Sequence, residues 1–305
     1  MYDIIIIGAG PAGLCAALYA RRAEKSVLLI EKSTFGGQIT NSPRVENYPG
    51  FISMSGNELA EKLLDQVMTH GAEIELAEVK KLEKLDTGYL VITDDSSFEA
   101  KSVIIATGSR HRPLGIERED EFIGGGVSYC AVCDGAFYKD KTVAIIGGGN
   151  TALQEAVLLS DGCKKVYVVQ NLAYFTGEES LLRVVETRGN VELITSSVVT
   201  ELVGVGSIEG IKIIDVETGV ERQLTLDGIF VAIGQIPENE PFADVVALDE
   251  RGYITAAEDC LPDTKYEGIF VAGDCRTKSV RQVTTATADG AVAALAACRY
   301  VDSLK

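Results

Sequence analysis

Two cysteines, Cys130 and Cys133, lie two residues apart near the middle of the chain, and Asp134 follows directly. Thiols at this spacing can close a small disulfide ring, and a neighbouring carboxylate can manage protons during thiol–disulfide exchange. The N-terminal residues show no secretion signal, so the pair indicates a redox-active dithiol rather than a structural crosslink. Asp134 can also serve as a cap for the following turn, and this alternative stays open.

The composition limits the classes of partner. A chain of 305 residues is long enough for two domains with their own cores, and 46% hydrophobic and 24% charged residues are ordinary for a globular protein. The net charge of −17 argues against nucleic acid or an anionic membrane as a partner. No apolar run approaches the ~20 residues that span a bilayer. We therefore predict a cytoplasmic protein that binds neither nucleic acid nor membrane.

The remaining cysteines have no close partner in sequence. In a reducing compartment they are expected to be small buried residues; they are Cys15, Cys163, Cys260, Cys275 and Cys298. No Cys/His pattern has the spacing of a metal site, and His70 and His111 are the two histidines of the chain. The sequence predicts no metal centre.

The N-terminal segment has the pattern of a dinucleotide-binding unit. An apolar strand at residues 3–7 runs into Gly8-Ala9-Gly10-Pro11-Ala12-Gly13. A helix is expected from Leu14 to Arg21, then a second strand from Ser26 to Ile30, which Glu31 closes. Glycines at these positions allow a tight turn and a close approach of backbone N–H groups to a pyrophosphate, and an acid at the second strand end accepts from ribose hydroxyls.

A second unit of the same kind begins at Thr142, with Gly147-Gly148-Gly149-Asn150-Thr151-Ala152 as its glycine turn. A helix to about Ser160 and a strand from Lys165 to Val169 complete it. A late buried strand, 268–272, leads into Gly273-Asp274 and lies beyond the second unit. The sequence therefore predicts an α/β protein with two three-layer Rossmann-like domains, the second inserted into the first: 1–114 with 245–305, and 115–244.

Over nearly its whole length the chain resembles the low-molecular-weight thioredoxin reductases. The match rests on several motifs in order: Gly8–Gly13, Gly36-Gly37-Gln38, Glu46–Gly50, Cys130–Asp134, Gly147–Ala152, and Gly273-Asp274 through Arg281-Gln282-Val283. The resemblance implies a bound FAD, a homodimer, thioredoxin as the partner, and rotation of one domain against the other during turnover.

The resemblance also implies roles for individual residues. Cys133 would lie nearer the flavin, Cys130 would exchange with thioredoxin, and Asp134 would act as the acid/base. Asp274 would contact the ribityl chain, and Arg281 with Gln282 the flavin edge, where a basic group favours the reduced anionic flavin. The full cofactor-binding set that we predict is Gly8, Gly10, Pro11, Ala12, Gly13, Glu31, Gly37, Gln38, Asn47, Gly108, Asp274, Arg281, Gln282 and Val283.

The resemblance fails at one place. Such reductases follow their second nucleotide strand with His-Arg-Arg and a further Arg four residues later, and these guanidiniums grip the 2′-phosphate of NADPH. This chain has Gln170 at the histidine position and Asn171, Leu172 and Thr176 at the arginine positions. The nearby Arg183 and Arg188 do not restore the motif. Three lost contacts, at about 1.5–3 kcal/mol each, make NADPH a poor donor.

Three interpretations of the electron flow follow. In the first, reduced ferredoxin delivers electrons directly to the flavin, as in the ferredoxin-dependent flavin thioredoxin reductases, which this pattern resembles. Arg276, Lys278 and Arg281 would then steer the acidic carrier. In the second, NADH or NADPH is the donor, although no acid stands at the strand end to bind an NADH ribose. In the third, the protein is a flavin dithiol oxidase that passes electrons to oxygen.

Overall fold

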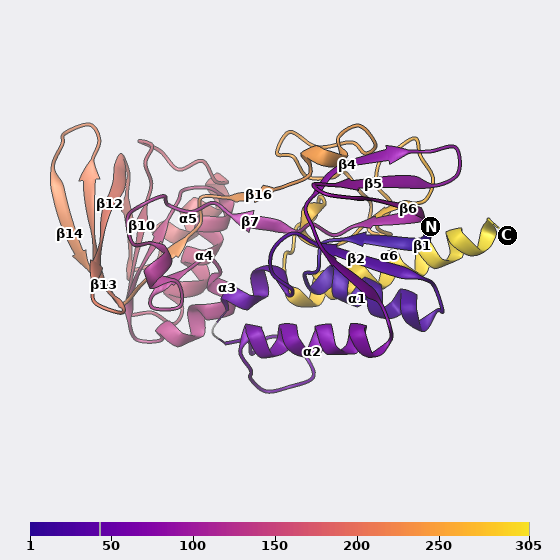
Figure 1. Cartoon of the computed structure of the whole chain (residues 1–305). Helices are drawn as coiled ribbons and strands as arrows, with labels where there is room; N and C mark the ends of the chain where they lie inside the picture. Colours follow the sequence, from indigo (N-terminus) through magenta and orange to yellow (C-terminus); the bar gives the residue numbers. More distant parts are fainter. Residues whose placement is uncertain (43, 305) are drawn as a thin grey trace. The chain divides into compact units, whose positions relative to one another are not determined.

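The computed structural model describes residues 1–42 and 44–304. The chain divides into two compact units, Met1–Arg110 with Ile236–Lys305 as unit 1, and His111–Gln235 as unit 2. Each unit is built on its own sheet, mixed in unit 1 and parallel in unit 2 (Figure 1). The α/β class, with a second nucleotide-type domain inserted into the first, is thus confirmed.

The sheet of unit 1 has the strand order β3-β2-β1-β6-β5-β4, and β17 pairs with β6. Its strands are β1 (Tyr2–Ile7), β2 (Val27–Glu31), β3 (Glu73–Leu76), β4 (Val79–Lys84), β5 (Tyr89–Thr93), β6 (Ser97–Ile105) and β17 (Ile269–Val271). Strand β6 belongs to two layers, because its first half pairs antiparallel with β5 and its second half pairs parallel with β1 and β17. The carboxyl ends of β1, β6 and β17 consequently lie at one edge of the sheet.

Helices cover one face of this sheet and the β4–β5 hairpin covers the other. The helices are α1 (Pro11–Arg22), α2 (Gly56–Thr69) and α6 (Val283–Ser303). Alanines fill the contact between α1 and α6, and a Cβ on Gly290 would lie 2.2 Å from the Ala12 carbonyl oxygen. Small residues at this contact allow two helices to approach closely. Residues on alternate faces of β1 enter separate cores, as the period of two in a strand requires.

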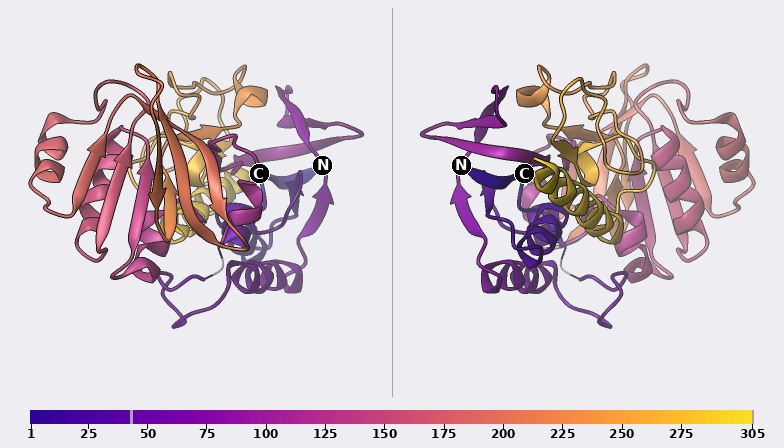
Figure 2. Two further views of the ribbon diagram at one scale, coloured as in Figure 1. Left: turned by 90° about the vertical axis from the view of Figure 1, so that its left-hand side faces the viewer. Right: turned by 90° about the vertical axis from the view of Figure 1, so that its right-hand side faces the viewer.

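Unit 2 repeats the plan with a five-stranded parallel sheet of order β11-β10-β9-β15-β8. Its strands are β8 (Val127–Ser128), β9 (Thr142–Ile146), β10 (Lys165–Val169), β11 (Val191–Ile194) and β15 (Gly228–Val231). Helices α3 (Ala131–Asp134), α4 (Asn150–Ser160) and α5 (Glu179–Glu186) belong to one side. The antiparallel strands β12 (Ser197–Gly204), β13 (Ile208–Asp215) and β14 (Glu221–Thr225) form a separate layer, drawn in salmon and orange beside the magenta parallel strands in Figure 2.

Two short strands join the units. Strands β7 (Ser109–His111) and β16 (Gln235–Pro237) pair with each other, and both unit boundaries fall inside this ribbon. The boundaries that we predicted from sequence were near 114 and 245. The segment 236–244 belongs to unit 1 because Phe242 packs in its core and the Asn239 amide donates to Gly252 and Cys275 carbonyls.

The two predicted glycine units have the expected order of elements. Helix α1 begins at Pro11 rather than Leu14, since proline is well suited to the first turn of a helix. Among the described residues, no helix combines the length and apolarity needed to cross a membrane, and no cluster of His, Cys, Asp and Glu could hold a metal ion.

Candidate active site and cofactor site

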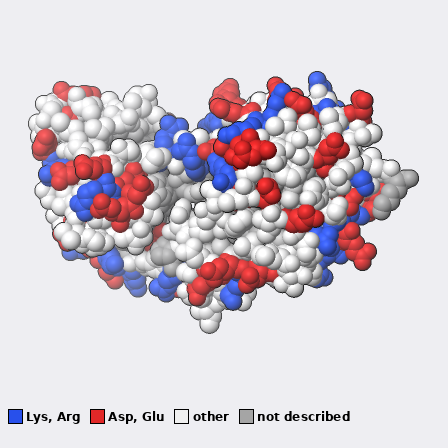
Figure 3. Space-filling model, viewed as in Figure 1, with Lys and Arg blue, Asp and Glu red and all other residues white. Residues whose placement is uncertain are grey.

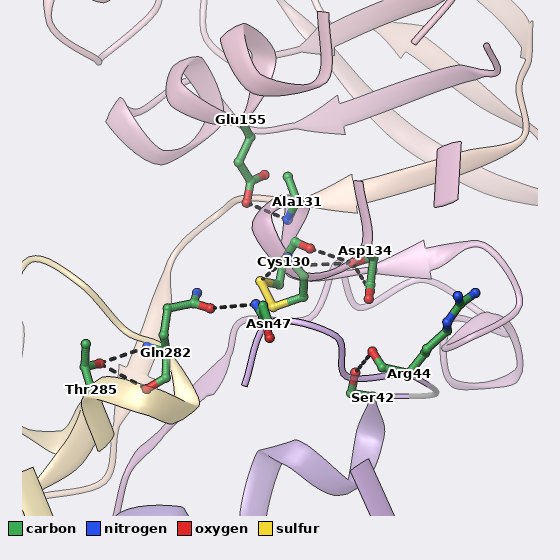
Figure 4. The surroundings of a disulfide bond; sticks show 11 residues. Ser42, Arg44, Asn47, Cys130, Ala131, Asp134, Glu155, Gln282 and Thr285 are labelled. Carbon is green, nitrogen blue, oxygen red and sulfur yellow. Dashed lines mark hydrogen bonds between the residues drawn. A yellow bond between two sulfur atoms is a disulfide. The ribbon is translucent and has the colours of Figure 1, made fainter. Parts of the chain in front are cut away.

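The cysteines form a disulfide at the start of a one-turn helix. Cys130 and Cys133 are bonded, with Cα atoms 5.3 Å apart, and Cys130 is the N-cap of α3. The backbone N–H of Cys133 donates to the Cys130 sulfur at 3.2 Å. Both cysteines are half-buried, and Val132 between them is exposed. Figure 4 shows this bond with Asp134 and Glu155 of the same unit. The dithiol predicted from the spacing is therefore geometrically able to close.

Asp134 is held beside the disulfide by a serine that sequence reasoning missed. The Ser128 hydroxyl donates to Asp134 Oδ2 at 2.7 Å and accepts from the Cys130 N–H at 3.1 Å. The other oxygen, Oδ1, is buried with no partner among the described residues. Burial raises the pKa of Asp134, against a smaller lowering by Ser128. A carboxyl that keeps its proton to a higher pH is suited to protonate a departing thiolate.

A second carboxyl lies at the other end of α3. Glu155, on helix α4, accepts from the Ala131 N–H at 3.3 Å (Figure 4). It is 9% exposed, and burial raises its pKa to about 7. The sequence carried a signal for this residue: Glu155 shares the apolar face of α4 with Ala152 and Leu159, where a charged residue is uncommon.

The segment before the cysteines is fixed by a buried acid. Glu119 accepts from the backbone N–H groups of Leu114 and Gly115 and from the Tyr129 hydroxyl. The Tyr129 ring stacks on His111 with centroids 5.1 Å apart. These contacts hold the chain immediately upstream of Cys130.

The first glycine loop of unit 1 is shaped for a ligand that passes over its backbone. A Cβ on Gly8 would lie 2.4 Å from the Ala106 carbonyl oxygen, and one on Gly13 would lie 1.8 Å from the Gly8 oxygen. A Cβ on Gly10, in contrast, meets nothing within 4 Å. Gly8 therefore allows close contact with the chain after β6 and Gly13 the contact of α1 with the loop, whereas Gly10 leaves open space at the start of α1.

Glu31 braces this loop. One carboxylate oxygen accepts from the Ala9 N–H at 2.8 Å, and the other accepts from the Ser33 N–H at 2.9 Å. The side chain is 8% exposed. From the sequence, Glu31 was predicted to bind a ribose, and its hydrogen bond to the glycine loop was not predicted. Each carboxylate oxygen has a further lone pair, so both roles are compatible.

The loop after β17 carries a buried carboxyl without a partner. Asp274 Oδ1 finds no hydrogen-bond donor in the described part of the chain, and burial raises the pKa of Asp274 to about 6. On the neighbouring helix, Asp289 accepts from the Gly273 N–H at 3.0 Å. Asp289 also binds the Arg276 guanidinium and the Lys278 ammonium, each at 2.9 Å. Arg276 and Lys278 thus hold the loop, and their side chains are 2% and 5% exposed.

Arg281, predicted at the flavin edge, is anchored within its own loop. Its guanidinium donates to the carbonyls of Lys278 and Arg276 and lies 4.2 Å from the centre of the Tyr253 ring. Its Nε is buried and has no partner among residues 1–42 and 44–304. Arg281 and Asp274 therefore each present a buried polar atom that a ligand could satisfy.

The other predicted residues of unit 1 lie around the same end of its sheet. The Asn47 amide donates to Gln282 Oε1 at 3.2 Å, and Val283, the first residue of α6, packs on Ile39 and Val45. Gly37 opens the short helix η1 (Gly37–Asn41), and a Cβ on it would lie 3.2 Å from the Gly10 Cα. Gly108 has open space where a Cβ would be, and Gln38 is exposed.

The glycine loop of unit 2 is covered by its own chain. The Gly148 carbonyl accepts from the Thr176 N–H at 2.8 Å, the Gly177 N–H at 3.0 Å and the Thr176 hydroxyl at 3.3 Å. The Gln170 side chain packs against Gly148, since a Cβ there would lie 2.4 Å from it. Its amide donates to the Tyr174 carbonyl, and Gln170 is 5% exposed.

The nearest arginines of unit 2 are already paired. Arg183 binds Glu179 one turn away, and Arg188 binds Asp161. Figure 3 shows basic groups next to acidic ones on the visible face rather than in one large basic patch. The segment from Gln170 to Glu178 supplies no cationic side chain of its own.

The chain matches known proteins over nearly its whole length. The family described as pyridine nucleotide-disulphide oxidoreductase matches residues 2–290. A thioredoxin reductase of Listeria monocytogenes is 40% identical over 100% of this chain and 95% of its own, and one of Bacillus subtilis is 39% identical over 100% and 96%. The crystal structure of thioredoxin reductase from Streptococcus pyogenes has a TM-score of 0.94 at 39% identity, covering 99% of each chain.

These matches define the class. The chain belongs to the pyridine nucleotide-disulphide oxidoreductase family, and it is a flavoprotein disulfide oxidoreductase. Within that family its relatives are thioredoxin reductases of the low-molecular-weight type. FAD is the cofactor of this class, and unit 1 fits it: the open space over Gly10 suits a pyrophosphate, and the unpartnered atoms of Asp274 and Arg281 suit the polar groups of a flavin nucleotide.

Proposed function

We propose that the protein is an FAD-dependent thioredoxin-disulfide reductase whose electron donor is reduced ferredoxin rather than NADPH. Two electrons, one from each of two reduced ferredoxins, would enter through the bound FAD, reduce the Cys130–Cys133 disulfide and leave to thioredoxin. We also propose that it acts in the cytoplasm as a homodimer. Relatives named thioredoxin reductase support the acceptor. The donor is argued from unit 2 alone.

The observation that carries the donor assignment is the neutral segment over the second glycine loop. A 2′-phosphate is a dianion, and its recognition needs planar cations such as guanidinium groups. The positions that would supply them hold Asn171, Leu172 and Thr176, and Thr176 bonds to Gly148 instead. Gly147 then serves the close approach of the loop to Ala232, and Gly148 that of the Gln170 side chain, rather than the binding of a dinucleotide.

The chemistry at the dithiol follows from the side chains around it. FAD supplies the two-electron acceptor and donor when it is bound. We assign the attack on the thioredoxin disulfide to Cys130, which forms a mixed disulfide, and the resolving attack to Cys133, which reforms the Cys130–Cys133 bond. Asp134, held by Ser128, gives a proton to the thiolate that leaves.

Ferredoxin docking does not rest on the basic residues that first suggested it. Arg276 and Lys278 form ion pairs with Asp289, and Arg281 donates hydrogen bonds to backbone carbonyls. A one-electron carrier needs only a small, transient contact close to the flavin. The proposal therefore depends on the absence of a cationic nucleotide site and not on a steering patch.

Two alternatives, NADH as the electron donor and oxygen as the electron acceptor, have weaker support. NADH lacks the 2′-phosphate, but Gln170, which takes the place of a ribose-binding acid, is buried and bonded to Tyr174. A flavin dithiol oxidase would pass electrons from a small dithiol to oxygen; it shares the fold and also lacks the arginines. Neither alternative is favoured by a contact of this chain.

Anaerobic bleaching of the flavin absorbance tests the proposal. NADPH, NADH and reduced ferredoxin are added separately to the FAD-loaded protein, and oxidised thioredoxin follows. We expect rapid bleaching by ferredoxin alone, then recovery of the absorbance as thioredoxin is reduced. Rapid bleaching by either pyridine nucleotide would overturn the donor assignment, and oxygen consumption with a small dithiol in place of thioredoxin would favour the oxidase.

A further inference from the structure

Glu155 is a buried carboxyl that the proposed function does not use. Its Oε1 accepts from the Ala131 N–H at 3.3 Å, and its Oε2 is buried with no partner among the described residues. Ala131 directly follows Cys130, so this carboxyl is hydrogen-bonded to the peptide group that joins the two residues. Figure 4 shows the Glu155 side chain reaching from α4 to the start of α3.

This position is costly for an ionised group. A buried polar atom without a partner costs about 1–3 kcal/mol, and more when it is charged. Burial is the main cause of the raised pKa of Glu155, and the Ala131 N–H opposes it only in part. A neutral side chain of the same size would fill the same space on α4 without this cost, so packing alone gives no reason for an acid here.

The charged groups on the elements packed against α4 do not offset the negative charge of an ionised Glu155. Of the elements packed against α4, helix α3 carries Asp134, which is bound by Ser128. Strand β10 carries Lys165, which is paired with Glu192. The remaining ionisable groups on these elements are Tyr167 on β10 and Glu179, Arg183 and Glu186 on α5, of which Glu179 and Arg183 bind each other. The groups on these elements that change charge during turnover are the dithiol and Asp134, and of the two cysteines it is Cys130 whose following peptide N–H Glu155 binds.

We propose that Glu155 is a positioning residue of the dithiol site that sets the acidity of the Cys130 thiol through its own charge. This inference rests on the proposed function in one respect, namely that Cys130 is the thiol that exchanges with thioredoxin. When Glu155 is ionised, its negative charge disfavours a thiolate at Cys130; when it is protonated, the thiolate forms more readily. The Ala131 N–H keeps the carboxyl in place in both states.

The disulfide bond accepts two electrons from the reduced flavin and breaks, one sulfur takes a proton from solvent, and the other remains a thiolate. The new negative charge raises the proton affinity of Glu155, which takes up the second proton. The Cys130 thiolate then attacks the thioredoxin disulfide, and the first thioredoxin sulfur leaves with a proton from Asp134. The Cys133 thiol returns a proton to Asp134 and attacks the mixed disulfide. The second thioredoxin sulfur leaves and takes a proton from solvent, to which Glu155 releases its own.

The test measures the acidity of Cys130 directly. In the FAD-loaded Cys133→Ser protein, the rate of Cys130 alkylation by iodoacetamide is followed against pH by mass spectrometry of the Cys130 peptide. Glu155→Gln keeps an oxygen acceptor for Ala131 and removes the charge. We expect it to shift the alkylation profile about one pH unit lower, which is about tenfold faster alkylation on the rising limb. Glu186→Gln, which removes an exposed carboxylate of the same unit, should leave the profile unchanged.

An identical profile for the parent and Glu155→Gln would overturn the proposal, as would an equal shift in Glu186→Gln. If Glu155→Gln does not fold, a second measurement, on the Asp134→Asn protein, still tests the proposal. Its infrared difference spectrum on reduction should gain the stretch of a protonated carboxyl; a spectrum without this band also overturns the proposal. Alkylation uses neither an electron donor nor thioredoxin, so its outcome is independent of the donor assignment.

Discussion

The two glycine loops share one backbone design and differ in what lies over it. A Cβ on Gly8 or on Gly147 would lie 2.4 Å from a carbonyl oxygen, that of Ala106 or Ala232. The N–H of each donates to the end of the adjacent strand, at Ile30 or Val169. Strand, turn and helix therefore meet in the same way in both units.

The difference lies in the residues that follow the second strand. In unit 1, Gly36 and Gly37 pass beside the loop, and Gly10 faces open space. In unit 2, Thr176 lies over the loop and Gln170 packs against Gly148. Under the proposed donor assignment, the glycine-rich turn of unit 2 serves close packing without making a nucleotide site. The flanking side chains decide whether a phosphate is recognised.

The largest expected effect is at the dithiol. Cys130→Ser should reduce turnover with thioredoxin at least about 10³-fold, because no mixed disulfide can form. The flavin absorbance and its bleaching by the donor should be retained. Cys163→Ser, which changes a buried free thiol of the same unit, is the control and should keep its activity. Turnover in Cys130→Ser near the wild-type rate would rule out this electron path.

Restoring cations to unit 2 should convert the second loop toward the behaviour of a nucleotide site. The triple variant Asn171→Arg, Leu172→Arg and Thr176→Arg is expected to raise kcat/KM for NADPH about 10²-fold or more, since charge-assisted contacts contribute about 1.5–3 kcal/mol each. Bleaching by ferredoxin should not change. If the triple variant were no more active with NADPH than the parent protein, then the missing arginines alone would not explain why NADPH is a poor donor.

A matched pair of glycine substitutions compares the loops directly. Gly10→Ala should fold, because Gly10 has a φ of −72° and open space for a methyl group, yet it should weaken FAD binding about tenfold or more. Gly149→Ala adds a methyl group 3.8 Å from the Thr176 hydroxyl and should alter neither flavin content nor activity. Flavin absorbance per chain after dialysis measures the first variant. Loss of donor activity in the second would indicate a working nucleotide site in unit 2.

The smallest effect concerns stability against pH. The folded-state pKa of Glu155 is about 7 and its ordinary value is 4.5, so the folded protein binds more protons between these values. Its contribution to the free energy of unfolding is present below pH 4.5 and is lost as pH rises through 7, by about 3 kcal/mol. The gain in melting temperature of Glu155→Gln over wild type should therefore be larger at pH 8 than at pH 5. Parallel melting curves across this range would contradict the raised pKa.

Much of the fold could be predicted because its signals are local. The buried strands, glycine turns and following helices appear as contiguous patterns, and both units formed as expected. The unit boundaries were harder, since the assignment of 236–244 depends on Phe242 entering a distant core and on the Asn239 bonds. No local pattern marks either contact.

The candidate site was predictable where a motif carries it and not where side chains meet through the fold. The Cys130–Cys133 pair and the glycines were readable from spacing. Ser128 and Asp289 were not, because their partners lie on other elements or depend on how a turn closes. Glu155 was marked only by its place on the apolar face of α4, which does not reveal its bond to Ala131. The basic residues Arg276 and Lys278 were assigned to docking, since a sequence does not show that one buried acid binds both.

Calorimetric titration of the FAD-loaded, oxidised protein with NADP⁺ tests the contrast between the loops most directly. The account predicts one tightly held FAD per chain and no measurable heat of NADP⁺ binding up to about 1 mM, a concentration at which even a weak site of about −4 kcal/mol would begin to fill. Saturable binding in the micromolar range, abolished by a bulky substitution at Gly149, would contradict it and make unit 2 a functional nucleotide domain.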